Sequence, residues 1–166
     1  MNAIIDNSIL IQIDELQMRY IHALDNKNFQ EWLETFSTDE STSYICTSAE
    51  NEENNFPIAL MYDDCRGRIE DRVTFIQKIW AGTFEDYRSR HFINRTRTES
   101  LGGDVYTVET NFSILYTPES GRTEVQVSGV YKDKIKITGA SENNLFLSKK
   151  AIYDTTVVPR YIVYPF

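Results

Sequence analysis

The chain has 166 residues, of which 41% are apolar and 25% charged, and its formal net charge is −8. This length and composition are typical of one globular domain, here 1–166, rather than of a disordered chain. Only 17 Lys and Arg residues stand against 25 Asp and Glu residues. Nucleic-acid binding needs a basic face that displaces counterions from phosphates, so we expect no nucleic-acid partner.

The cellular location is predicted from the N-terminus, the apolar runs and the cysteines. The first ten residues contain Asp6 and no basic cluster, which is not the layout of a signal peptide. No apolar run approaches the roughly 20 residues that cross a bilayer. Cys46 and Cys65 form no CxxC pattern and no disulfide framework. We expect a soluble, cytoplasmic protein that does not associate with a membrane.

Helical spacing of apolar residues dominates the first half of the chain. Ser8 is the expected N-cap of a first helix, in which apolar residues recur from Ile9 to Leu24. A second, short helix is expected over 29–36, where Trp32 belongs to one apolar stripe.

A mixed segment follows the two helices. Residues 41–48 are expected to form a strand, and the polar residues 50–55 a loop. The apolar segment 56–62 is compatible with a strand or with the approach to a helix. A third helix is expected over about 68–80.

The second half alternates β-branched or aromatic residues with polar ones. This pattern predicts long strands over 105–116, 123–138 and 145–157, after a strand region that starts near Ser89. The turn at 119–122 is expected to use Gly121 for a positive φ. The aromatic tail 158–166 is expected to pack on its own domain or on a partner. Helices followed by strands predict an α+β fold, with the helices packed in a strongly curved antiparallel sheet.

The His and Cys residues are the first candidates for metal ligands. Two His and two Cys are also the ligands of a Rieske cluster. The residues are His22, His91, Cys46 and Cys65. No Cys lies within three residues of a His, and no carboxylate is spaced to complete a facial triad for iron with the two His. We therefore expect no metal site and no cofactor in this chain.

Tyr20, Asp25 and His91 form the candidate catalytic set. A helix that ends in Tyr and Asp, facing a curved sheet that carries a His, could build an acid/base pocket. Burial would raise the pKa of such a carboxylate toward neutrality. The simpler interpretation makes Tyr20 a core residue, Asp25 a helix-end residue and His91 a structural histidine.

Two charged segments are candidates for a subunit interface or for ordinary solvated faces. The first is 62–72, which is dense in both signs of charge; the second is a series of arginines between Arg88 and Arg97. Arg is favoured at interfaces because its planar guanidinium pairs bidentately with carboxylates. In a strand, Arg95 and Arg97 share one face unless a bulge intervenes. The interface candidates are Asp64, Arg66, Arg72, Arg90 and Arg95.

Three stretches carry a resemblance to a known family. They are YIHALDNKNFQEW at 20–32, LMYDDCRGRIEDRV at 60–73 together with RHFINR at 90–95, and IYDTTVVPRYIVYPF at 152–166. Together they resemble the small (beta) subunit of Rieske-type aromatic-ring-hydroxylating dioxygenases. The resemblance runs nearly from end to end of the chain.

The resemblance implies a cone-shaped fold like that of nuclear transport factor 2 (the NTF2-like, SnoaL-like superfamily). It also implies a structural, non-catalytic subunit in the catabolism of aromatic compounds, with acids of the benzoate, anthranilate or salicylate type as substrates. In that family the large (alpha) subunit holds the Rieske [2Fe–2S] cluster and the mononuclear iron. Three large and three small subunits form a hexamer, in which the small subunits associate as a trimer.

The same cone fold also hosts enzymes, which leaves two alternatives. A stand-alone dehydratase (a lyase) or isomerase would use a cone pocket with Asp25 and His91. The dehydratase type needs a second His in the pocket, whereas His22, two residues after Tyr20 on a helix, is expected to point elsewhere. A small-ligand binding module without chemistry is the remaining alternative.

Overall fold

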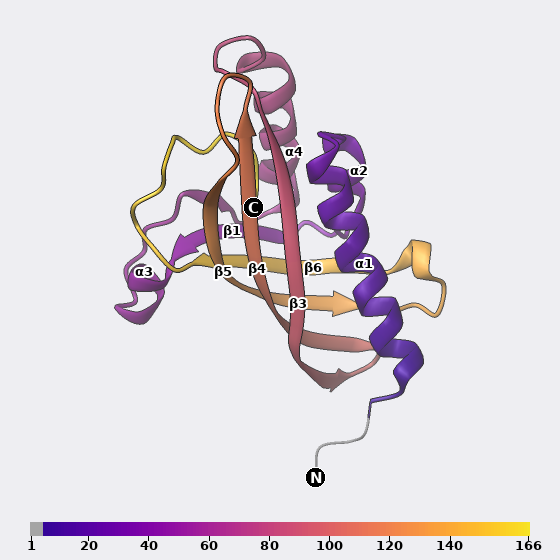
Figure 1. Cartoon of the computed structure of the whole chain (residues 1–166). Coiled ribbons are helices and arrows are strands. Elements are labelled where there is room, and N and C mark those ends of the chain that lie inside the picture. Colours follow the sequence, from indigo (N-terminus) through magenta and orange to yellow (C-terminus); the bar gives the residue numbers. More distant parts are fainter. Residues whose placement is uncertain (1–4) are drawn as a thin grey trace.

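The computed structural model describes residues 5–166 (Figure 1), so expectations about residues 1–4 lie outside the described part. Its helices are α1 (Asn7–Asp25), α2 (Phe29–Glu34), α3 (Ala49–Glu53) and α4 (Arg66–Thr74), with a π-helical turn η1 (Phe75–Ile79) and a 3-10 turn η2 (Ser141–Asn143). Its strands are β1 (Ser43–Ser48), β2 (Met61–Asp63), β3 (Tyr87–Gly102), β4 (Val105–Pro118), β5 (Glu124–Lys136) and β6 (Leu145–Tyr153).

The six strands form one unclosed sheet in the order β2-β1-β6-β5-β4-β3. The long strands β3, β4 and β5 bend strongly along their length, and α1 and α2 lie together at one side of the sheet. The predicted α+β class with a curved sheet is confirmed. One detail of the prediction is wrong: β1 pairs parallel with β6, while all the other neighbours are antiparallel.

Local capping sets where the helices begin. Asp6, not Ser8, caps α1: its backbone is extended, and its side chain accepts a hydrogen bond from the Ser8 amide at 2.7 Å. Residues 50–55, expected as a loop, contain most of α3, which starts where the Ser48 hydroxyl accepts from the Asn51 amide at 3.2 Å. The predicted third helix corresponds to α4 followed by η1.

The strands predicted in the second half are present, although β6 ends at Tyr153 rather than at 157, and one turn detail differs. The turn between β3 and β4 uses positive φ at Gly102, Gly103 and Asp104. Gly121, in the turn between β4 and β5, does not have the positive φ expected for it; after β5, Gly139 does have a positive φ. The ambiguous segment 56–62 ends in the short edge strand β2.

Aromatic side chains fill the interior between the helices and the sheet. Each side chain is less than 2% exposed in the set Trp32, Tyr20, Tyr44, Tyr131, Phe36, Phe146 and Phe166. Tyr20 makes edge-on contacts with Phe36, Tyr131 and Phe146. The last residues of the tail also enter this core, so the tail packs on its own domain.

Candidate functional site

Asp25 and His91 meet at the end of α1. Asp25 is the last residue of the helix, and the alternation of β3 turns His91 inward. The His91 ring nitrogen Nδ1 lies 2.6 Å from Asp25 Oδ1, and the His91 backbone amide donates to Asp25 Oδ2 at 3.1 Å. The carboxylate therefore fixes both the ring and the backbone of a residue 66 positions away.

Tyr20 does not join this pair. Its hydroxyl donates to the backbone carbonyl of Phe166, and the Tyr44 hydroxyl donates to the same carbonyl at 3.3 Å. The Phe166 amide in turn donates to the Tyr44 oxygen at 2.9 Å. Burial raises the pKa of both tyrosines well above the ordinary value, so they act as neutral hydrogen-bond donors in the core.

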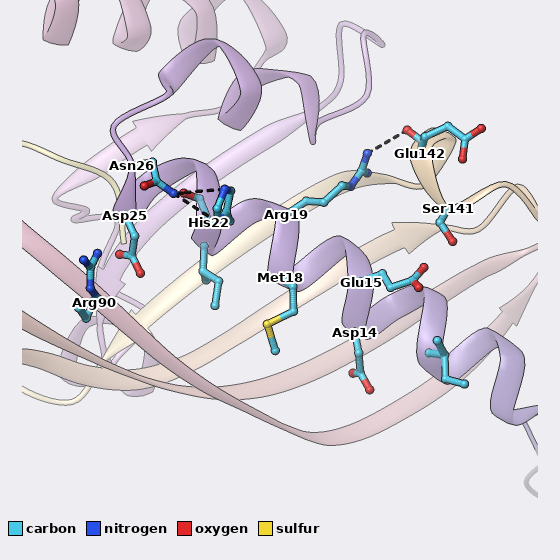
Figure 2. A pocket seen from close by; sticks show the side chains of 12 residues that line it. Asp14, Glu15, Met18, Arg19, His22, Asp25, Asn26, Arg90, Ser141 and Glu142 are labelled. Atoms are coloured by element: carbon cyan, nitrogen blue, oxygen red, sulfur yellow. Dashed lines mark hydrogen bonds between the residues drawn. The ribbon is translucent and has the colours of Figure 1, made fainter.

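The Asp25–His91 pair has little contact with solvent. The His91 side chain is 1% exposed, and its second ring nitrogen, Nε2, is buried without a hydrogen-bond partner in the described part of the chain. Asp25, 14% exposed, lines a broad groove of about 1080 Å³ along the outer face of α1 (Figure 2). His22 lines the same groove, is exposed and contacts Asn26, so it points away from the cone interior as predicted.

A second polar cluster was missed from the sequence. Lys149 Nζ donates to Asp133 Oδ2 at 2.9 Å and to Gln17 Oε1 at 3.2 Å, while Gln17 Nε2 donates to Asp133 at 2.6 Å and to Thr110 at 3.3 Å. Both charged side chains are 0% exposed. The cluster joins α1 to β4, β5 and β6 in the centre of the fold.

Aromatic rings surround the ammonium group of Lys149. Its Nζ lies 3.8 Å from the centroid of the Tyr131 ring and 4.4 Å from those of Tyr20 and Phe146. Burial raises the pKa of Asp133 and lowers that of Lys149, and their mutual attraction opposes both shifts. The available signal was the alternation of β5, which puts Asp133 on the same inward face as Tyr131.

Two of the interface candidates, Arg66 and Arg72, form their hydrogen bonds with other residues of the same chain. Arg66 donates to the backbone carbonyls of Leu33, Phe36 and Ser37, close to the end of α2, at 3.0 to 3.2 Å. Arg72 forms a bidentate pair with Asp63, whose side chain is only 6% exposed. Burial alone would lower the pKa of Arg72, but the Asp63 carboxylate outweighs this and raises it.

The other three candidates lie nearer to solvent. Arg95 pairs with Asp14 at 2.7 Å, and a bulge separates Arg95 from Arg97 in the β3–β4 register. Asp64 forms an exposed pair with Arg68 at 3.1 Å. Arg90 is exposed and lines the groove of Figure 2. Asp64 and Arg90 are therefore the two that are most available to a partner.

Within residues 5–166, no group of three or more His, Cys, Asp and Glu side chains is arranged to hold a metal ion. Over the same residues, no helix combines the length and the apolar character needed to cross a bilayer. Cys46 and Cys65 are both free thiols.

Comparison with known proteins gives consistent matches. Residues 19–160 match the family model described as ring hydroxylating beta subunit. The small subunit of anthranilate 1,2-dioxygenase from Burkholderia cepacia is 26% identical over 160 residues, which is 96% of this chain and 96% of that protein.

Two crystal structures of beta subunits share the fold. One, from Novosphingobium aromaticivorans and attributed to an aromatic-ring-hydroxylating dioxygenase, has a TM-score of 0.78 at 27% identity over 92% of this chain and 94% of that one. The other, from the benzoate 1,2-dioxygenase of Burkholderia mallei, has a TM-score of 0.70 at 25% identity, over 86% of this chain and 88% of that one. The chain belongs to the family of ring hydroxylating beta subunits, the small subunits of aromatic-ring-hydroxylating dioxygenases.

Proposed function

We propose that this chain is a structural, non-catalytic small subunit that supports the large subunit of a dioxygenase. The observation that carries the proposal is the sealed interior of the cone. Large aromatic side chains fill it, and His91, the residue best suited to acid/base chemistry, is 1% exposed. A catalytic group has to come within hydrogen-bond distance of its substrate, and a substrate cannot reach the buried His91 ring.

The partner is a large (alpha) subunit that carries the Rieske [2Fe–2S] cluster and the mononuclear iron. Family membership supports this division of labour, and we propose a hexamer of three large and three small subunits in the cytoplasm. Among the interface candidates, Asp64 and Arg90 are the charged side chains available for contacts between chains within such a hexamer, while Arg66, Arg72 and Arg95 serve mainly to hold this chain together.

Aromatic acids are the proposed substrate class of the assembly. Two of the relatives reported above belong to dioxygenases of anthranilate and benzoate, which are both aromatic carboxylic acids. The large subunit would supply the substrate pocket.

Co-expression of this chain with its large (alpha) subunit tests the proposal. We expect a complex that contains both chains, iron in the large chain only, and no turnover by the small chain alone. A large subunit that folds, binds iron and hydroxylates aromatic acids equally well without this chain would contradict the proposal. Turnover by the isolated chain, abolished by Asp25→Asn, would instead support a lyase or isomerase.

A further inference from the structure

An apolar strip lies along one edge of the sheet. It consists of Phe56, Ile58, Leu60 and Tyr62, with exposed fractions of 50%, 60%, 44% and 55%. The four residues alternate along an extended segment that leads into the edge strand β2, so they share one side of it. Four large exposed apolar side chains within seven residues indicate a contact surface.

Hydrogen bonds to the neighbouring elements hold the strip in place. The Leu60 amide donates to the Cys46 carbonyl at 2.7 Å. The Ile58 carbonyl accepts from the Thr47 hydroxyl at 2.8 Å and from the Asn51 amide group at 3.2 Å. The strip is therefore ordered before any partner arrives, which lowers the entropic cost of binding.

Negative charge flanks the strip. Helix α3 is tied to the strip through Asn51, and it carries three glutamates. Glu52 pairs with Lys150, whereas Glu50 and Glu53 are exposed and form no ion pair with any described residue.

The opposite edge of the sheet carries a basic apolar patch, made of Arg88, Arg90, Phe92, Leu115 and Val125. The register aligns Arg90 with Leu115, and Leu115 with Val125, across β3, β4 and β5. Phe92 and Val125 are 59% and 60% exposed. Arg88 and Arg90 form no ion pair within residues 5–166.

One chain cannot join these two surfaces, because β2 and β3 are the two ends of an unclosed sheet. We infer that the apolar strip of one copy docks on the basic apolar patch of the next, with Glu50 and Glu53 facing Arg88 and Arg90. The inference rests on the proposed function, in which several copies of the small subunit stand together. A contact between two different surfaces generates a ring when the rotation closes. Pairing strip with strip would instead set acid against acid, which costs affinity.

Charge reversal tests the inference on the intact chain. Glu50→Lys/Glu53→Lys and, separately, Arg88→Glu/Arg90→Glu each put like charges across the contact. Each variant is expected to weaken self-association about tenfold or more in analytical ultracentrifugation. Combining all four substitutions in one chain restores opposite charges and is expected to recover most of the lost association.

Controls and contrary outcomes separate this inference from the proposed function. Glu40→Lys/Glu119→Lys and Arg122→Glu/Lys136→Glu change the net charge equally at exposed positions elsewhere and should leave self-association unchanged. A wild-type chain that stays monomeric while co-purifying with the large subunit overturns the inference and leaves the proposed function intact. The inference is also overturned if the variant with all four substitutions does not recover self-association. So does loss of large-subunit binding with unchanged self-association, because the surfaces then serve the large chain.

Discussion

Lys149 Nζ lies 2.9 Å from Asp133 Oδ2, and neither side chain has any exposed surface. Taking two charges out of water costs several kcal/mol each, which the pair recovers only through attraction and further hydrogen bonds. Gln17 contributes two of those bonds, and three aromatic rings surround the ammonium group. The arrangement specifies how α1, β5 and β6 pack, at little net gain in stability.

Removing one partner of this pair is therefore predicted to be costly. Lys149→Met leaves the Asp133 carboxylate buried and unpaired, so we expect a loss of about 3–5 kcal/mol in the free energy of unfolding at pH 7. Lys149→Met/Asp133→Asn keeps an acceptor for Gln17 and removes both charges. The double variant should lose much less free energy of unfolding than Lys149→Met and Asp133→Asn lose in sum. A double-mutant cycle from urea unfolding measures this difference.

The deficit of Lys149→Met should depend on pH. Burial already raises the pKa of Asp133 in the folded protein, and loss of Lys149 raises it further. A carboxyl whose folded pKa exceeds its unfolded value gives stability below the unfolded pKa and loses it as pH rises through the folded pKa. The variant should therefore lose less stability at pH 5 than at pH 8. An equal deficit at both values would contradict a charged, unpaired Asp133.

The sequence predicts the long strands well because a strand buried on one face alternates visibly. Phe112 and Ile114 face the core while Asn111 and Ser113 do not, and this period of two is readable without a structure. The parallel pairing of β1 with β6 was not predictable in the same way. It joins residues about 100 positions apart, and no local pattern records which strands become neighbours.

Only the Asp25–His91 part of the site was predicted from the sequence. The cone expected for the family brought Asp25 and His91 together, while the Lys149 cluster depends on residues from four elements. Helix α3 was missed because all its residues after Ala49 are polar, and its start depends on the Ser48 cap rather than on an apolar face. Asp6 displaced Ser8 as the cap of α1 for a similar reason, since either residue type can cap and only the backbone geometry decides.

Asp25→Ala is predicted to destabilise the protein by about 2–3 kcal/mol. The substitution leaves the buried His91 amide without its acceptor and frees the ring from its 2.6 Å contact. Asp25→Asn keeps an oxygen for the amide and should lose less. Urea unfolding gives both free energies, and nitrogen NMR of the imidazole shows whether the ring is still fixed. A loss as small as that of an ordinary surface substitution would mean that the pair is not structural.

Tyr44→Phe is predicted to cost more than Tyr20→Phe. Tyr44 both accepts from the Phe166 amide and donates to its carbonyl, so Tyr44→Phe leaves a buried N–H unpaired, at about 1–3 kcal/mol. Tyr20→Phe removes only a donor to a carbonyl that Tyr44 still serves, at about 0.5–1.5 kcal/mol. Thermal unfolding of the two variants under one set of conditions gives the order. The reverse order would place the main anchor of the tail at Tyr20.

Arg72 is predicted to stabilise the chain from within, through its bidentate pair with Asp63. Arg72→Met leaves the Asp63 carboxylate without its charged partner in a site only 6% exposed, so we expect a loss of about 3–5 kcal/mol. Arg72→Lys keeps the charge but not the planar fork, and should lose about 1–2 kcal/mol.

The neighbouring exposed pair is the matched control for Arg72. Arg68 and Asp64 lie 3.1 Å apart with side chains 55% and 47% exposed, so solvent screens their attraction. Arg68→Met should change the free energy of unfolding by about 0.5 kcal/mol or less. Urea unfolding of Arg72→Met, Arg72→Lys and Arg68→Met measures all three values. An Arg72→Met chain that is as stable as wild type alone, but fails to bind the large subunit, would instead assign Arg72 to the interface.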